Sequence, residues 1–212
     1  MDLDRLLPAL VVATSLLSAC SSDRMLTRSA LSGVASIEIV KRPTPLLEVK
    51  TLSGAILTSF GGIGTVPIGA YQDATASKQV HDQVRLPDFG ELLVRKFAER
   101  APTEVPGWPK TTATYDSPKK DRAATGGAIL SFDLVSQAVT VYGGYFVQGT
   151  GILSDANGRT LWRKFIYYRS RDFGRFRPIE EFQKDPTLLI REIELAANDT
   201  ASVLIQNIRQ GL

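Results

Sequence analysis

Hydrophobic and polar residues alternate along several short stretches of the chain, and a period of two residues predicts β-strands. The first stretch is 36–41, SIEIVK, in which Ile37 and Ile39 alternate with polar residues. Pro43 and Pro45 then interrupt the pattern, because proline cannot donate a hydrogen bond to a neighbouring strand. Residues 46–52 either form a short strand or lead into the glycine-rich segment that follows. Further strands are expected at 110–115, 128–136, 138–154 and 159–170.

The last three of these stretches predict an antiparallel meander. They are rich in β-branched and aromatic residues, which favour strands. Asp155-Ala156-Asn157-Gly158 separates the second stretch from the third, and an Asn-Gly pair at such a junction is a strong signal for a hairpin turn. The glycines at positions 143, 144, 149 and 151 indicate a bulge, strong coiling or the close approach of another element.

Hydrophobic residues at three- and four-residue spacing predict two amphipathic helices. The first begins after Asp88, which is expected to cap it with Glu91 as capping-box partner, and runs to residue 100. The second covers about 186–209, with Asp185 as its cap and Pro186 in the first helical position. A more polar helix is expected at 70–84. The inner stripe of the C-terminal helix is predicted to comprise Leu189, Ile193, Ala196 or Ala197, Thr200, Val203 and Asn207.

These elements together predict an α+β fold. A strand, two helices, a meander of long strands and a final helix are expected to form a single antiparallel sheet with the helices packed on one face. The chain of 212 residues contains no internal repeat, and its length suits one domain with a substantial core.

The amino-terminal end carries an apolar run from Leu6 to Leu17, which has the proportions of a signal peptide and is too short for a stable membrane span. The run ends in Leu17-Ser18-Ala19-Cys20, which resembles the lipobox of bacterial lipoproteins, and Cys20 is the only cysteine of the chain. The resemblance implies that Cys20 is the first residue of the mature protein and carries acyl chains such as palmitate. The alternative is a small buried cysteine that follows an amphipathic helix.

The lipobox resemblance divides the chain into three parts. Residues 1–19 are expected to be a lipoprotein signal peptide, 20–35 a lipidated flexible tether, and 36–212 a single α+β domain that faces the periplasm. The position after Cys20 holds Ser21 and no Asp, which in lipoproteins of this kind implies sorting to the outer membrane. With Cys20 acylated, no disulfide can form within the chain.

The order of these elements is similar to that of the transport-auxiliary lipoproteins of ABC-type exporters and, more loosely, to that of the lipoprotein that helps assemble lipopolysaccharide. The resemblance implies a non-enzymatic outer-membrane lipoprotein, bound to the membrane by its lipid anchor, that serves transport or envelope assembly by contacting a partner protein of the envelope. The second hypothesis is a periplasmic module that binds a lipid or a glycan.

Residues 51–72 contain no Asp, Glu, Lys or Arg. Five glycines and a proline make a membrane-spanning helix unfavourable. The segment is either a buried, irregular entry to the next helix or a contact that enters a membrane or packs against a partner through small residues. For the contact, the candidate residues are Phe60, Gly61, Gly62, Ile63, Gly64 and Ile68.

Basic and aromatic residues are interleaved in WRKFIYYRSRDFGRFR, residues 162–177. One interpretation is a strand with Trp162, Ile166 and Tyr168 in or near the core and basic residues on the other face. The other is a site for an anionic headgroup, glycan or acidic loop, with Arg163, Lys164, Arg169 and Arg171 as candidate contacts. An export signal argues against a nucleic-acid partner for this stretch.

The inventory of reactive side chains favours a protein that is not an enzyme. The single histidine, His81, lies in a polar helical stretch, and a Cys/His zinc site is excluded by the number of such residues. Ser117 and Lys120 have the S-x-x-K spacing of penicillin-recognising enzymes, but Pro118 and the polar surroundings indicate a loop. We therefore expect no catalytic residue, metal or cofactor. The net charge of +3 is too small to identify a partner.

Overall fold

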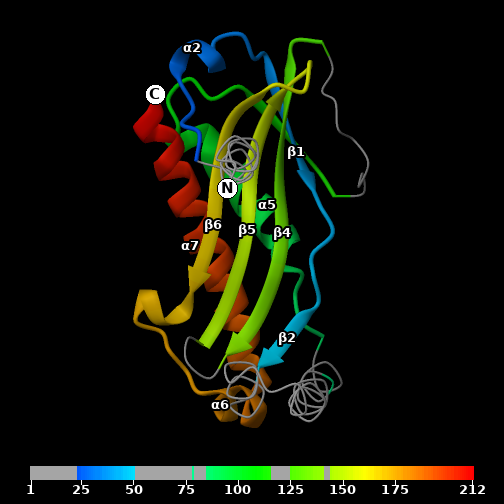
Figure 1. Cartoon of the computed structure of the whole chain (residues 1–212), viewed down its shortest axis with the longest axis vertical. Coiled ribbons are helices and arrows are strands. Elements are labelled where there is room, and N and C mark those ends of the chain that lie inside the picture. The colour runs from blue at the N-terminus through cyan, green and yellow to red at the C-terminus, as the bar shows by residue number, and fades with distance from the viewer. Residues whose placement is uncertain (1–22, 51–77, 79–84, 116–124, 141–143) are drawn as a thin grey trace, which may run out of the picture.

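The computed structural model of the chain describes residues 23–50, 78, 85–115, 125–140 and 144–212. The strands are β1 (Ser36–Lys41), β2 (Leu47–Lys50), β3 (Lys110–Thr114), β4 (Gly127–Thr140), β5 (Gly144–Asp155) and β6 (Thr160–Arg169). The helices are α2 (Arg28–Leu31), α5 (Phe89–Glu104), the 3₁₀ turn η2 (Ser170–Phe173), α6 (Ile179–Lys184) and α7 (Pro186–Gly211). Within these ranges the strands form a six-stranded sheet in the order β3-β1-β4-β5-β6, with β2 also paired to β4, and α5 and α7 lie behind it (Figure 1).

The sheet is mixed, so the prediction of a single antiparallel sheet is wrong. β4, β5 and β6 form the predicted antiparallel meander, but β1 runs parallel to both of its neighbours, β3 and β4, and β2 runs parallel to β4. Between β1 and β3 the chain passes through α5, and a crossover through a helix returns the chain in the same direction. The alternation within a strand shows which residues face the core, but it carries no information on the direction of neighbouring strands.

The meander is built from strands with different limits from those predicted. The sequence predicts a break between two strands at residue 137, but β4 continues through this residue to Thr140. The irregularity is a bulge within the strand, where the register shifts at the exposed Val135. Gly149 of β5 lies opposite this bulge, and a Cβ atom there would be 2.6 Å from the carbonyl oxygen of Asp133. The close approach expected for the glycines is therefore confirmed at this position.

The predicted hairpin between β5 and β6 is confirmed. Asp155 and Arg159 close it through a backbone hydrogen bond of 3.0 Å, and Gly158 has a φ of +78°, which suits glycine. The Asp155 carboxylate accepts hydrogen bonds from the backbone N–H groups of Arg159 and Asn157, at 2.9 and 3.0 Å. These bonds, with that of Arg159 as the largest contribution, hold the pKa of Asp155 below its usual value.

Helix α5 begins where the sequence predicts, because Asp88 caps it by accepting a hydrogen bond from the backbone N–H of Glu91 at 3.0 Å. Asp88 also accepts from Thr44 at 2.6 Å and pairs with Lys41 at 2.7 Å, so the cap ties the helix to the chain after β1. Burial by itself raises the pKa of Asp88, but the hydrogen bonds from Lys41, Thr44 and Glu91 outweigh it and leave this pKa below its ordinary value.

Helix α7 starts at Pro186, and Asp185 caps it through the backbone N–H of Thr187, as predicted. Its inner stripe differs from the prediction in the last turns. Val203 is 46% exposed, and its neighbour Leu204 is buried in its place. After Thr200 the buried residues of α7 are Ala201, Leu204, Ile205 and Ile208, and the predicted Asn207 does face the sheet, where its side chain accepts the indole N–H of Trp162.

The segment before β1 is not a flexible tether from residue 23 onward, which corrects that part of the prediction. Leu26 is fully buried, and helix α2 follows it. The end of α7 packs so closely that a Cβ atom on Gly211 would clash with the Leu26 carbonyl oxygen. Buried apolar side chains in a mostly polar stretch hold this segment on the domain. Across the ranges given above, no helix is both long and apolar enough to cross a membrane.

Candidate functional site

Strand β6 is one edge of the sheet, and the chain before α2 covers only the first part of it. Arg24 and Arg163 exchange two backbone hydrogen bonds, of 2.8 and 3.0 Å, in antiparallel orientation. One residue earlier, the Asp23 carboxylate accepts the N–H of Phe165 at 2.9 Å. A side chain thus takes the place of a backbone partner, and among the described residues the pairing with β6 ends here.

The edge backbone beyond Phe165 has no partner strand among the residues that the structure describes. In an antiparallel ladder, the residues that bond to one neighbour alternate with those that bond to the other. Because Arg163 and Phe165 direct their backbone groups outward, Tyr167 does so as well. Among the described residues, none forms a backbone hydrogen bond with Tyr167 on this side.

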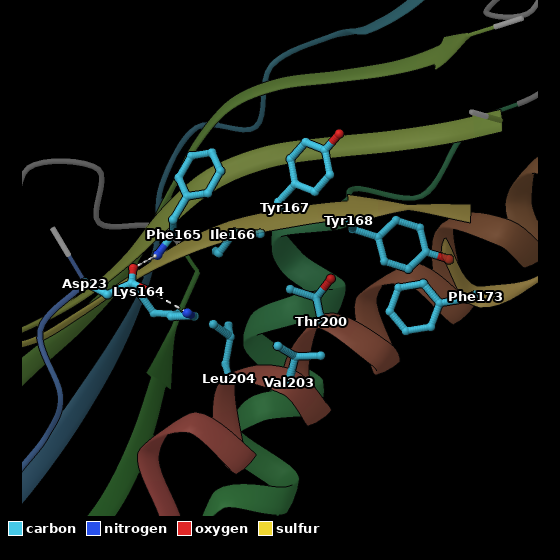
Figure 2. A pocket seen from close by; sticks show the side chains of 10 residues that line it. All are labelled: Asp23, Lys164, Phe165, Ile166, Tyr167, Tyr168, Phe173, Thr200, Val203 and Leu204. Carbon is cyan, nitrogen blue, oxygen red and sulfur yellow. Dashed lines mark hydrogen bonds and ion pairs between the residues drawn. The ribbon is translucent and has the colours of Figure 1, made fainter. Parts of the chain in front are cut away.

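A pocket of about 290 Å³ lies beside this open edge, between β6 and α7 (Figure 2). Ile166 and Tyr168 point into it from the strand, whereas Phe165 and Tyr167 point away from the helix. The side chains around it are largely apolar, and Val203 lies exposed at its rim. We call this cavity the edge pocket; it is lined by Asp23, Lys164, Phe165, Ile166, Tyr167, Tyr168, Phe173, Thr200, Val203 and Leu204.

Thr200 of α7 brings an unpaired hydroxyl to the edge pocket. Its side chain is 5% exposed, and its Oγ1 atom is buried without a hydrogen-bond partner among the residues that the structure describes. A buried hydroxyl without a partner destabilises a fold by about 1–3 kcal/mol. Thr200 is therefore a buried polar group beside the pocket whose hydroxyl has no partner among the described residues.

A buried polar cluster joins β6 and η2 to α7 at one side of the pocket. The Glu192 carboxylate accepts hydrogen bonds from the Tyr168 hydroxyl at 2.7 Å and the Ser170 hydroxyl at 2.8 Å. The Arg175 guanidinium donates to the Tyr168 hydroxyl at 2.7 Å and pairs with Asp199. Arg175 Nε lies 3.7 Å from a Glu192 oxygen. The cluster fixes the position of Tyr168 and so shapes the pocket.

The pKa shifts in this cluster favour a neutral Tyr168 and a charged Arg175. Burial, as the largest effect, raises the pKa of Tyr168 well above its usual value. Burial lowers the pKa of Arg175, but hydrogen bonds to Asp199 and Tyr168 outweigh it and raise that pKa. Tyr168 therefore stays neutral and Arg175 stays charged near neutral pH. Neither group has the pKa near neutrality that suits a general acid or base.

On the other face of the sheet, aromatic side chains form an exposed row. Phe165 is 43% and Tyr167 50% exposed, and their rings stack with centroids 6.3 Å apart. Phe146 of β5 packs edge-on against Tyr167 at 5.4 Å, and the Arg169 guanidinium lies 5.5 Å from the Tyr167 ring centroid. The open edge of β6 is thus flanked by apolar surface on both faces.

The four candidate contacts for an anionic ligand do not converge on one place. Lys164 pairs with Asp23 beside the edge pocket, and Arg169 pairs with Asp172 at 2.9 Å. Arg163 lies partly buried at the bridge to Arg24, and Arg171 lies exposed in η2. The core interpretation of the same stretch is confirmed, because Trp162, Ile166 and Tyr168 are all at most 2% exposed.

Several predictions fall on residues outside the described ranges. They include the lipidation site Cys20, the helix at 70–84 except residue 78, His81, the pair Ser117 and Lys120, and the candidate contacts Phe60, Gly61, Gly62, Ile63, Gly64 and Ile68. Within the described ranges, His, Cys, Asp and Glu side chains form no group of three or more that is arranged to hold a metal ion.

No protein-family model matches the chain, and searches of curated proteins and of solved structures found no match either.

Proposed function

We propose that the protein is a lipid-anchored accessory protein of the bacterial outer membrane that acts through protein contacts and not through catalysis. The observation that carries this proposal is the edge of β6, where backbone groups without a partner among the described residues lie beside apolar surface on both sides. Exposed strand edges pair readily with other chains. Exposed apolar patches with aromatic residues are typical of protein interfaces.

The lipobox resemblance at Leu17-Ser18-Ala19-Cys20 supports the location. Asp23, which is fixed on β6, follows Cys20 by only three residues, and three residues span at most about 10 Å. An acylated Cys20 would therefore hold the edge of β6 close to the membrane surface. A partner reached from there is a protein of the same membrane, as expected for a transport or assembly accessory.

The charge arrangement gives less support to a site for anionic lipids or glycans. Lys164 and Arg169, two of the four candidate cations, already have carboxylate partners in Asp23 and Asp172. An anionic ligand would have to compete with these carboxylates. The aromatic and backbone groups of the β6 edge face no such competition from the described residues.

The anchoring part of the proposal is tested by replacing Cys20 with serine. The variant is exported with a cleavable signal peptide that lacks a lipobox, and we expect it in the soluble periplasmic fraction after alkaline carbonate extraction of the membranes. The wild-type protein should remain in the membrane fraction and incorporate labelled palmitate, because acyl chains hold it there. A Ser21→Ala variant, which keeps the lipobox cysteine, serves as the control.

Retention of the Cys20→Ser variant in the membrane pellet would contradict lipid anchoring as the sole attachment. It would direct attention to the uncharged residues 51–72. Absence of palmitate from the wild-type protein would contradict the lipobox interpretation itself.

A further inference from the structure

We propose that Arg24 and Arg163 together bind the phosphate group of an anionic lipid headgroup and so give the protein a second contact with the membrane beside its acyl chains. This inference rests on the lipid anchor of the proposed function. It adds a specific site on the domain and the chemistry that the site recognises.

The two arginines form a pair of like charges across the edge of the sheet. Arg24 and Arg163 exchange two backbone hydrogen bonds in antiparallel orientation. Side chains directly opposite each other in such a ladder lie on the same face, with Cβ atoms about 4.5–5.5 Å apart. Like charges in this position repel each other and destabilise the pairing. An anion bound between the two guanidinium groups removes the repulsion.

No acidic side chain of the described ranges neutralises this pair. The nearest carboxylate along the chain, that of Asp23, is paired with Lys164. The Nε atom of Arg163 is buried and has no hydrogen-bond partner among the residues that the structure describes, and Arg24 is exposed. The pair therefore differs from Lys164 and Arg169, because an anion that binds it does not have to displace a carboxylate of the described residues.

The pair lies on the face of the sheet that points away from the helices. Trp162 is buried and donates a hydrogen bond to Asn207 of α7, so the next side chain of β6, that of Arg163, points to the opposite face. Phe165, two residues further on, points away from the helix in the same way (Figure 2). Helices α5 and α7 lie behind the sheet and do not shield the pair from a membrane on the other side (Figure 1).

Phosphate is the anion that suits both the pair and its place in the chain. The planar fork of one guanidinium binds two phosphate oxygens, and the remaining oxygens can accept hydrogen bonds from the second arginine. Arg24 follows Cys20 by four residues, which span at most about 14 Å. An acylated Cys20 therefore keeps Arg24 within reach of the headgroups, where tethering gives the lipid phosphates a high effective concentration.

The test uses the mature chain with Cys20→Ser, which lacks acyl chains, and vesicles of phosphatidylcholine alone or mixed with phosphatidylglycerol. We expect the protein to sediment with the mixed vesicles only. Arg24→Gln and Arg163→Gln should each weaken this binding about fivefold or more, because one basic residue near an anionic surface contributes about that factor. Arg95→Gln removes an exposed charge from α5, behind the sheet, and should change binding by less than about twofold.

Thermal unfolding separates a binding role of Arg24 from a structural one. Because Arg24 is exposed, Arg24→Gln opens no cavity, and by relieving the repulsion it should raise the melting temperature in buffer without phosphate. Inorganic phosphate, compared with chloride at equal ionic strength, should raise the melting temperature of the parent protein and leave that of Arg24→Gln unchanged. A melting temperature of Arg24→Gln below that of the parent in both buffers would assign Arg24 a structural role and contradict the phosphate site.

Inorganic phosphate also distinguishes the source of the bound group. At constant ionic strength it should displace the protein from the mixed vesicles, since both phosphates occupy one site. Stabilisation by inorganic phosphate without binding to the mixed vesicles would overturn the lipid headgroup as the source and assign the site to soluble phosphate. Equal weakening by Arg24→Gln and Arg95→Gln would show attraction by overall charge only and overturn the site. Failure of the anchor itself is seen separately, because palmitate incorporation by the wild-type protein measures it.

Discussion

Replacement of Trp162 by alanine is expected to lower the free energy of unfolding by about 3–5 kcal/mol, the usual range for a large aromatic residue lost from a core. Trp162 is fully buried, and its indole N–H donates to the Asn207 side chain of α7 at 3.0 Å. A Cβ atom on Gly151 would lie 2.9 Å from the indole ring, so the ring fills the space that this glycine leaves. The substitution thus opens a cavity between sheet and helix and also removes a hydrogen bond.

Urea unfolding monitored by circular dichroism measures this loss. Phe165→Ala is the matched control, because this aromatic residue of the same strand is 43% exposed and its removal leaves no buried cavity. If Trp162→Ala lowered the free energy of unfolding no more than Phe165→Ala, the result would contradict the packing of α7 on β6. It would also contradict the shape of the edge pocket.

Replacement of Glu192 by alanine should lower the free energy of unfolding by about 3–5 kcal/mol, as expected when one partner of a buried ionic cluster is removed. The change leaves the Tyr168 hydroxyl without its acceptor, removes one of the two acceptors of the Ser170 hydroxyl, and takes away the carboxylate that lies 3.7 Å from the buried Nε of Arg175. These groups lie where the chain passes from β6 into η2. Loosening them should also disorder the Tyr168 side of the edge pocket.

Glu194→Ala, on an exposed position of the same helix, should change stability by less than about 0.5 kcal/mol. Glu192→Gln should recover part of the loss, because the amide oxygen still accepts a hydrogen bond. Equal stability of the Glu192→Ala and Glu194→Ala proteins would show that the polar cluster does not hold β6 to α7.

Local sequence signals predicted most of the elements of the fold. The alternation around Ile37 and Ile39 predicted β1, the capping residue Asp88 predicted the start of α5, and the Asn-Gly pair predicted the hairpin between β5 and β6. These signals act within a few residues of each other, so one sequence is enough to recognise them. The direction of β1 relative to β3 and β4 depends on long crossovers, and no local pattern specifies it.

The candidate site was only partly accessible from the sequence. Alternation placed Trp162 and Tyr168 in the core, but the pocket exists because of how α7 is rotated against β6. Both i+3 and i+4 positions share a helix face with Thr200, and the sequence does not decide between Val203 and Leu204. The structure places Leu204 inside and leaves Val203 at the pocket rim. No sequence pattern indicated that Asp23 would accept the backbone N–H of Phe165, because Asp23 lies in a short polar stretch without periodicity.

The most direct test of the account is photo-crosslinking in living cells from Tyr167, replaced by a photoreactive phenylalanine analogue, with the same analogue at Gln206 as control. Partner binding at the β6 edge predicts a crosslink from position 167 to one protein of the outer membrane, lost in the Val203→Trp background and absent from position 206. Crosslinks of equal yield from both positions, or none from position 167, would contradict the assignment of the β6 edge as the partner-binding site.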